Sequence, residues 1–176
     1  MQIGADTNWS VASVGLRFMG AVKTNGTLWM WGYNDTGELG DGTVARRSSP
    51  VQIGALTNWS YISCGSGANV AIKTDGTLWA WGDNGYGELG QNDIVLRSSP
   101  VQVGALTTWS TGQAKQVTSA AIKTDGTLWS WGRNATGQLG LNDTVGRSSP
   151  VQVGASTNWN YVLSANSSDD LFALTT

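Results

Sequence analysis

Few side chains in this sequence are suited to catalysis. The chain has no histidine and one cysteine, Cys64, which excludes an imidazole base, an internal disulfide and a zinc site of the usual ligands. The positions fifty residues before and after Cys64 hold Val14 and Ala114, so a buried structural thiol is expected. We find no nucleophile–base pair and therefore predict a protein that is not an enzyme and binds no metal or cofactor.

A glycine-rich segment, residues 37–42, superficially resembles a phosphate-binding loop. No helix is expected after it, so the positive end of a helix dipole would be missing, and turn geometry explains the glycines better. Asn34, Asn84 and Asn134 are expected to close Asx turns in this loop and its equivalents. The acidic residues nearby lack the spacing of an EF-hand: Glu38, Asp41, Glu88, Asp93 and Asp143.

An arginine precedes Ser-Ser-Pro three times, at Arg47, Arg97 and Arg147. These arginines would form a basic ring in one interpretation. In the other, which we favour, each binds loop carbonyls or a repeated acid such as Glu38 or Glu88.

Three loop positions change in size and charge while their surroundings stay nearly constant. A constant scaffold with variable loop positions is typical of a binding surface, although drift at exposed positions would look the same. The candidate partner-binding residues are Tyr33, Asp83, Arg133, Tyr86, Arg46 and Leu96.

All of these residues belong to an internal repeat of fifty residues. Pro50, Pro100 and Pro150 follow this period, and so do all 10 tryptophans. We predict a single repeat domain over residues 1–176. Its repeat units are expected at about 2–51, 52–101 and 102–151, with a partial unit at 152–176.

Each unit contains four signals for short strands. In the second unit they cover residues 59–64, 69–74, 77–81 and 99–103. Asp75-Gly76 separates two of them and predicts a hairpin with a type I′ turn. Proline has no N–H for a ladder, so Pro100 predicts that the fourth strand lies at a sheet edge.

Both faces of the predicted sheet are apolar. Trp79 and Trp81 share one face of the third strand, while Leu78 and Ala80 share the other. Each sheet must therefore be covered on both sides, which predicts an all-β fold of four-stranded antiparallel β-propeller blades, three complete and one partial.

The run Asp75–Gly90, DGTLWAWGDNGYGELG, resembles the repeat of the regulator of chromosome condensation family. The resemblance extends over essentially the whole chain and implies a β-propeller, usually of seven blades. The family commonly has a histidine where this chain has Phe18, Ala68 and Thr118, so no role of that histidine is carried over. The glycine three residues earlier is present as Gly15 and Gly65 and is replaced by Lys115.

A non-catalytic propeller that recognises a protein partner or assembles with other chains is the function we favour. The repeats resemble bacterial and bacteriophage members, which implies a structural or recognition component of a bacterial surface or a virion. One alternative is a guanine-nucleotide exchange factor or chromatin adaptor, although neither the expected insertion nor a basic tail is present. Another is a secreted propeller that inhibits an enzyme through a loop-lined face.

Composition limits the other possible partners. Charged residues make up 12% of the chain and the net charge is −2, which argues against general nucleic-acid binding. The sequence has no signal peptide and no apolar run long enough for membrane insertion, so virion and cytoplasm both remain open as locations.

The partial unit predicts an open assembly edge. Residues 171–174 look like its second strand, and an exposed apolar strand tends to pair with another chain. We expect this edge and the N-terminal segment to support self-association or binding to a larger assembly. The candidate edge residues are Gln2, Ile3, Leu171, Phe172 and Leu174.

Overall fold

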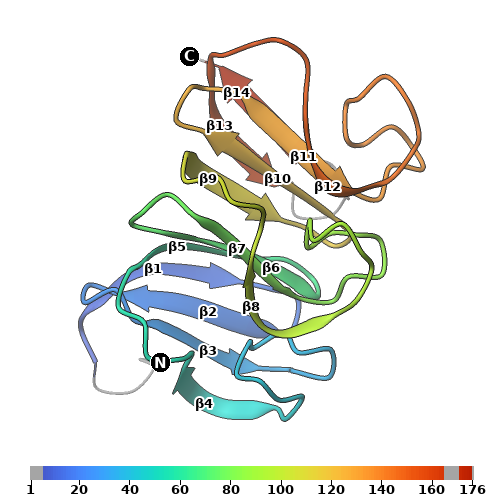
Figure 1. The fold of residues 1–176 in the computed structure, drawn as a ribbon. Helices are drawn as coiled ribbons and strands as arrows, with labels where there is room; N and C mark the ends of the chain where they lie inside the picture. The colour runs from blue at the N-terminus through green and yellow to red at the C-terminus, as the bar shows by residue number, and fades with distance from the viewer. Residues whose placement is uncertain (1–5, 165–170, 176) are drawn as a thin grey trace.

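The computed structural model describes residues 6–164 and 171–175. Every regular element in this part of the chain is a β-strand, and no helix there could cross a membrane. Three four-stranded antiparallel sheets follow one another along the chain, and a two-stranded sheet comes last (Figure 1). The all-β prediction is confirmed. The strands are β1 (Trp9–Val14), β2 (Phe18–Lys23), β3 (Leu28–Gly32), β4 (Arg47–Gln52), β5 (Trp59–Cys64), β6 (Ala68–Lys73), β7 (Leu78–Gly82), β8 (Arg97–Gln102), β9 (Trp109–Ala114), β10 (Thr118–Lys123), β11 (Leu128–Gly132), β12 (Arg147–Gln152), β13 (Trp159–Ser164) and β14 (Leu171–Thr175).

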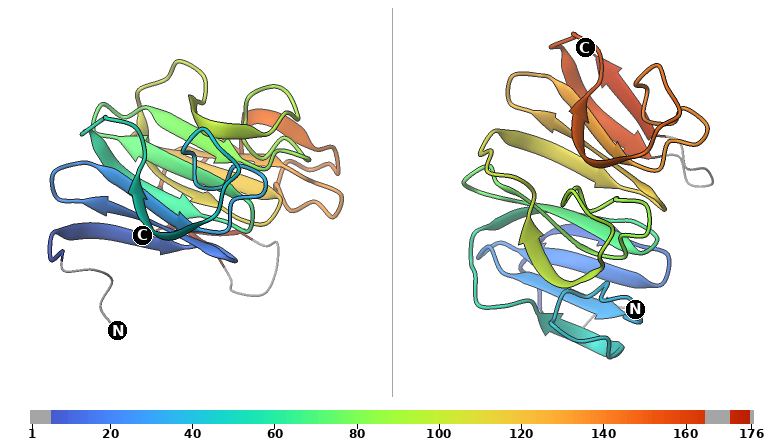
Figure 2. Two further views of the ribbon diagram at one scale, coloured as in Figure 1. Left: turned by 90° about the horizontal axis from the view of Figure 1, so that it is seen from below. Right: turned by 45° about the vertical axis from the view of Figure 1, so that its right-hand side comes forward.

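Strands β1–β4, β5–β8 and β9–β12 form the first, second and third blades, each with its strands in sequence order. The blades fan out side by side, from the blue first sheet to the red β13–β14 pair (Figure 2). The first strands of consecutive blades contact one another, so they lie along the inner side of the fan. The proline-containing fourth strands pair on one side only, as expected from the missing N–H.

The predicted hairpins are present, but their turn type is not the predicted one. Gly76 has a φ of 77°, whereas Asp75 is not among the residues of positive φ, and a type I′ turn needs positive φ at both. The Gly76 N–H donates to the Lys73 carbonyl at 2.9 Å, and the Lys73 N–H donates to the Thr77 carbonyl at 3.1 Å. This is a type I turn followed by a left-handed glycine, a three-residue loop. The Asp75 carboxylate stabilises it by accepting from the Thr77 N–H and hydroxyl.

The hydrophobic core lies between consecutive blades. Trp81 is fully buried and packs with Leu28, Met30 and Leu39 of the first blade. Trp79, the other tryptophan of strand β7, is only partly buried. The prediction that neighbouring blades cover the faces of each sheet is therefore confirmed for the face that carries Trp81, with Trp79 at the margin of the core.

The last two strands lie beside the third blade. Strand β13 contacts β9 and β10 and pairs antiparallel with β14, in the register Tyr161 to Leu174 and Ser164 to Leu171. Of the candidate assembly-edge residues, Leu171, Phe172 and Leu174 lie on β14, whereas Gln2 and Ile3 fall outside the described residues.

Candidate partner-binding surface

The variable residues are carried by long loops between the third and fourth strand of each blade. In an antiparallel sheet these loops lie at the same end as the loops between the first and second strands. A hydrogen bond links the two loops of the first blade, because the Tyr33 N–H donates to the Arg17 carbonyl at 3.0 Å. We call this end the loop face. Its segments in the three blades are residues 15–17 and 33–46, 65–67 and 83–96, and 115–117 and 133–146.

A buried asparagine organises each long loop. Asn84 is completely buried, and its Nδ2 donates to Oδ1 and the carbonyl of Asp93 and to the Val95 carbonyl, each at 3.1 Å. Its Oδ1 accepts from the Leu89 N–H at 2.9 Å. The expected Asx turn is therefore wrong. The side chain spans the loop and replaces backbone hydrogen bonds that an irregular buried segment cannot make itself.

The repeated arginines close the same loops. The Arg97 guanidinium contacts the Asp93 carboxylate at 2.6 Å and donates to the Val95 carbonyl at 2.8 Å. Arg147 makes the same contacts with Asp143 and Val145. The preference for loop carbonyls over a basic ring agrees with this geometry, but the acid is an aspartate of the loop and not Glu38 or Glu88.

The carboxylate of the first loop comes from a different position in the sequence. Arg47 pairs with Asp41 at 2.7 Å, although the residue equivalent to Asp93 is Thr43. The Thr43 hydroxyl donates to Asp41 at 2.6 Å. Burial would raise the pKa of Asp41, but the bonds from Thr43 and Arg47 outweigh it and lower the pKa. The equivalent arginines Arg47 and Arg97 therefore each pair with an aspartate, but the two aspartates hold different positions in the repeat.

The outer parts of the three loops expose large apolar side chains. Ile94 is 67% exposed, and Leu96 is 48% exposed at the end of the same run. Large aliphatic side chains are usually buried. Their exposure in all three long loops therefore distinguishes the loop face from an ordinary polar surface. The exposed apolar side chains in the long loops are Val44, Tyr86, Ile94, Val95, Leu96 and Val145.

Two of the candidate residues meet in the first blade. The Arg46 guanidinium lies over the Tyr33 ring at 4.5 Å and pairs with the Asp35 carboxylate at 2.8 Å. Arg17 approaches the same ring at 5.7 Å from the neighbouring loop. The hydrogen bonds from Arg46 and Tyr33 lower the pKa of Asp35.

Two others meet across the boundary between the second and third blades. The Arg133 guanidinium lies over the Tyr86 ring, 5.2 Å from its centroid, and both side chains are exposed. Asp83 is exposed, and its carboxylate accepts from the Asn84 N–H. The variable positions therefore provide two contacts between an arginine and a tyrosine ring, one in the first blade and one between the second and third blades.

Sequence reasoning identified Tyr86 and Leu96 but missed the other exposed apolar residues of this surface, Val44, Ile94, Val95 and Val145. Their repeat positions do not change in charge, which was the signal that selected the other candidates. A usable signal was present, since each follows a turn-rich segment and lies outside every strand pattern.

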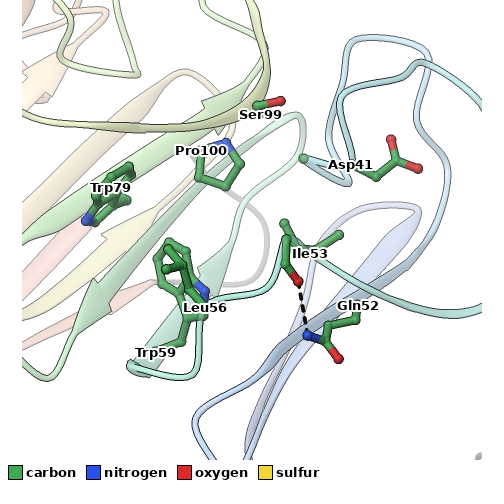
Figure 3. A pocket seen from close by; sticks show the side chains of 10 residues that line it. Asp41, Gln52, Ile53, Leu56, Trp59, Trp79, Ser99 and Pro100 are labelled. Atoms are coloured by element: carbon green, nitrogen blue, oxygen red, sulfur yellow. Dashed lines mark hydrogen bonds between the residues drawn. The ribbon is translucent and has the colours of Figure 1, made fainter.

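The described blades contain one thiol, scattered acidic side chains and a cavity between the first two blades. Cys64 is buried, and burial raises the pKa of its thiol to about 12. Within residues 6–164 and 171–175 no three side chains of histidine, cysteine or acid type gather where they could hold a metal. A cavity of about 290 Å³ between the first two blades, seen in Figure 3, is lined by Trp59, Trp79 and Pro100 and is mainly apolar.

Comparison with known proteins identifies the repeat. The model of the "Regulator of chromosome condensation (RCC1) repeat" matches residues 25–72, 75–121 and 125–170, and a second model of the same repeat matches residues 59–88. No curated relative matches the sequence significantly.

Solved structures show the same fold at low sequence identity. Human WBSCR16 is 18% identical with a TM-score of 0.74, and the match covers 82% of this chain and 37% of that protein. Prp20p from Saccharomyces cerevisiae is 19% identical with a TM-score of 0.75, and the match covers 88% of this chain and 40% of that protein. A structure of yeast RCC1 (Prp20) bound to Kap60 matches at the same identity and TM-score.

This chain thus spans about two fifths of the length of those propellers. Three family-model matches cover most of its residues, and each matched segment begins just before the third strand of one blade and continues into the next sheet. The protein belongs to the regulator of chromosome condensation (RCC1) repeat family.

Proposed function

We propose that the protein is a non-catalytic interaction module that binds a protein partner through its loop face. The observation that carries the proposal is the exposure of Ile94, Val95 and Leu96 in the same loop as Tyr86, whose ring lies under the Arg133 guanidinium. A surface that combines exposed aliphatic residues with tyrosine and arginine has the composition of a protein-binding surface. The hydrogen bonds of Asn84 and Arg97 within the loop reduce the ordering cost at binding.

A matched pair of variants tests the proposal. Leu96→Asp places a charge on the loop face. Leu106→Asp places one at a leucine of similar exposure in the segment between β8 and β9, outside the residues of the loop face. Binders selected from a displayed library of protein fragments against the unaltered chain are measured on both variants. We expect Leu96→Asp to weaken them at least about tenfold and Leu106→Asp to leave them unchanged. Equal binding to both variants, with the fold intact, contradicts the proposal.

An exchange-factor or chromatin-adaptor function is the second candidate. It is supported by the similarity in fold to Prp20p, whose structure was reported with its binding to Gsp1p and histones. A nucleotide-release assay with a GTPase of the Gsp1p type separates the two functions. Acceleration of release by this chain would favour the exchange factor, and an unchanged rate favours the interaction module.

The resemblance of the repeat motifs to bacterial and bacteriophage members supports a further proposal, namely that the protein is a structural component of a bacterial surface or a virion. Inhibition of a secreted enzyme through the loop face is the other use consistent with this surface. Detection of the chain in purified virions or envelope fractions tests the first, and its absence from both contradicts it.

A further inference from the structure

Two equivalent cavities, the boundary cavities, lie between the four-stranded blades. The first, between the first and second blades, has a volume of about 290 Å³, and the second, between the second and third blades, has a volume of about 310 Å³. Nearly every position that lines the first also lines the second, fifty residues later, and all of them lie between residues 40 and 150. Figure 3 shows the first cavity. The large apolar side chains in equivalent places are Leu56, Trp59 and Trp79 in the first cavity and Leu106, Trp109 and Trp129 in the second.

A buried lysine lies against the tryptophan pair of each cavity. The Lys73 Nζ is 3.5 Å from the centroid of the Trp79 ring and 4.8 Å from that of Trp59. Lys123 lies in the same way against the tryptophans of the second cavity, at 3.6 and 5.2 Å. The ring faces attract the ammonium groups, but they accept no ordinary hydrogen bond from them. Within the described residues neither amine forms an ion pair or donates to an oxygen.

The first blade shows which group such a lysine binds. Lys23 also lies over two tryptophan rings, and it donates to the Asp6 carboxylate at 2.8 Å. The next two repeats have Leu56 and Leu106 at the position of Asp6, and each of these leucines lines a boundary cavity. By this equivalence, the place from which a carboxylate reaches the lysine lies at the cavity wall in the second and third blades.

The acids of the nearby hairpins do not take that place. Asp75 attracts Lys73 electrostatically, but its carboxylate accepts hydrogen bonds from Thr77. Asp125 stands in the same relation to Lys123. Burial lowers the pKa of both amines in spite of this attraction. Each amine would therefore gain from a carboxylate in direct contact.

Each cavity also has a buried donor in its wall. Trp59 and Trp109 are both 3% exposed, and among the described residues their indole N–H groups have no hydrogen-bond partner. Trp79 and Trp81, by contrast, each donate to an oxygen of the protein. Buried donors are rarely left without an acceptor. This is a second, independent indication of a ligand that carries acceptor oxygens.

We propose that each boundary cavity binds a small organic carboxylate with one aromatic ring, its carboxylate on Lys73 or Lys123 and its ring against the tryptophans. The ring suits walls made of indole and leucine, and a cavity near 300 Å³ takes a single ring with a short acid chain. A cationic ligand would be repelled by the lysine. The site does not depend on the loop-face function, because Ile94, Val95 and Leu96 line neither cavity.

The two cavities differ in one charged position. Asp41 lines the first, where Arg47 pairs with it at 2.7 Å, and the equivalent residue in the second is the neutral Gln91. Since a second carboxylate close to Asp41 is partly repelled, we expect the second cavity to bind the ligand more tightly.

Binding of 3-phenylpropionate to the full chain tests the proposal, with 3-phenylpropionamide as the uncharged control. NMR of the indole N–H groups follows the titration. We expect saturable shifts of the Trp59 and Trp109 signals and none of Trp81, whose N–H is bonded to Glu38. The amide should bind at least about tenfold more weakly, because it lacks the charge that pairs with the lysine.

A pair of variants at an exposed leucine locates the carboxylate. Leu56→Asp supplies the second blade with the acid that the first blade has, so it should abolish the Trp59 response and leave that of Trp109 unchanged. Leu56→Asn, which lacks the charge, should retain both responses. The proposal is overturned if neither signal shifts at about 10 mM probe, if the amide binds equally well, or if the Trp59 response is the same in the two variants.

Discussion

The indole N–H of Trp81 donates to the backbone carbonyl of Glu38, 3.0 Å away in the preceding blade. The same carbonyl accepts a bond from the Asn69 side chain at 2.8 Å. These contacts join residues 31 and 43 positions apart in sequence, and Trp131 and Ser119 repeat them on Glu88. The two boundaries between the four-stranded blades are therefore held by buried hydrogen bonds as well as by apolar packing.

Replacement of Trp81 by alanine should be strongly destabilising. The change leaves a cavity between two blades and removes one of the two hydrogen bonds to the Glu38 carbonyl, so the free energy of unfolding should fall by about 3–5 kcal/mol. The matched control is Trp31→Ala, because Trp31 holds the same repeat position but is only partly buried. Urea unfolding measures both. A loss below about 1 kcal/mol for Trp81→Ala, or an equal loss for both variants, would contradict the packing described here.

Glu88 should make stability decrease as pH rises. Burial raises the pKa of its carboxyl group above the unfolded value, so the folded state binds the proton more tightly. The Glu88→Gln variant keeps an acceptor for the Tyr86 N–H, as Gln138 does for Thr136. Its stability relative to the native chain should increase from about pH 4 towards neutrality. A difference that stays flat or shrinks over this range, measured by urea unfolding, would disprove the assignment.

The ion pair between Lys23 and Asp6 suggests a substitution that would give the equivalent lysine, Lys73, a similar partner. Lys23 bonds the Asp6 carboxylate at 2.8 Å, whereas the equivalent of Asp6 beside Lys73 is Leu56. Burial lowers the pKa of Lys73. We expect Leu56→Asp to raise that pKa, measured by NMR of the lysine side chain, because a carboxylate favours the charged amine.

Leu56→Asn is the control for this variant. At pH 7 the aspartate variant should be the more stable of the two by up to about 1 kcal/mol, a limit set by solvent exposure of the pair. Since pairing with the lysine lowers the pKa of the carboxylate in the folded state, the difference should begin to shrink near pH 4 and be largely lost by about pH 3. A difference that persists at pH 3 would mean that charge is not responsible.

Cys64 should be unreactive in the folded protein. Burial keeps its thiol protonated, with a pKa of about 12, so almost no thiolate exists at pH 8. Alkylation by iodoacetamide, followed by mass spectrometry, should be at least about a hundredfold slower in buffer than in urea. Comparable rates would indicate that the site opens readily.

Sequence alone determined the repeat, the position of nearly every strand and the hairpins. These features depend on local alternation, on Asp-Gly and Asn-Gly turns and on proline at an edge, all of which act over a few residues. The resemblance to the family followed from the same short motif. Asp75 shows the limit, because its side-chain bonds to Thr77 select a type I turn where the dipeptide predicted type I′.

Tertiary structure decided which equivalent residues differ in role. Trp79 and Trp81 look alike in sequence, yet only Trp81 is fully buried, because burial depends on the face of the next blade. Arg47 and Arg97 bind aspartates from different repeat positions, since a carboxylate reaching the same point in space is sufficient. The contact of Arg133 with Tyr86 also depends on packing between blades. Interactions between distant residues depend on three-dimensional distance, which a repeat pattern does not specify.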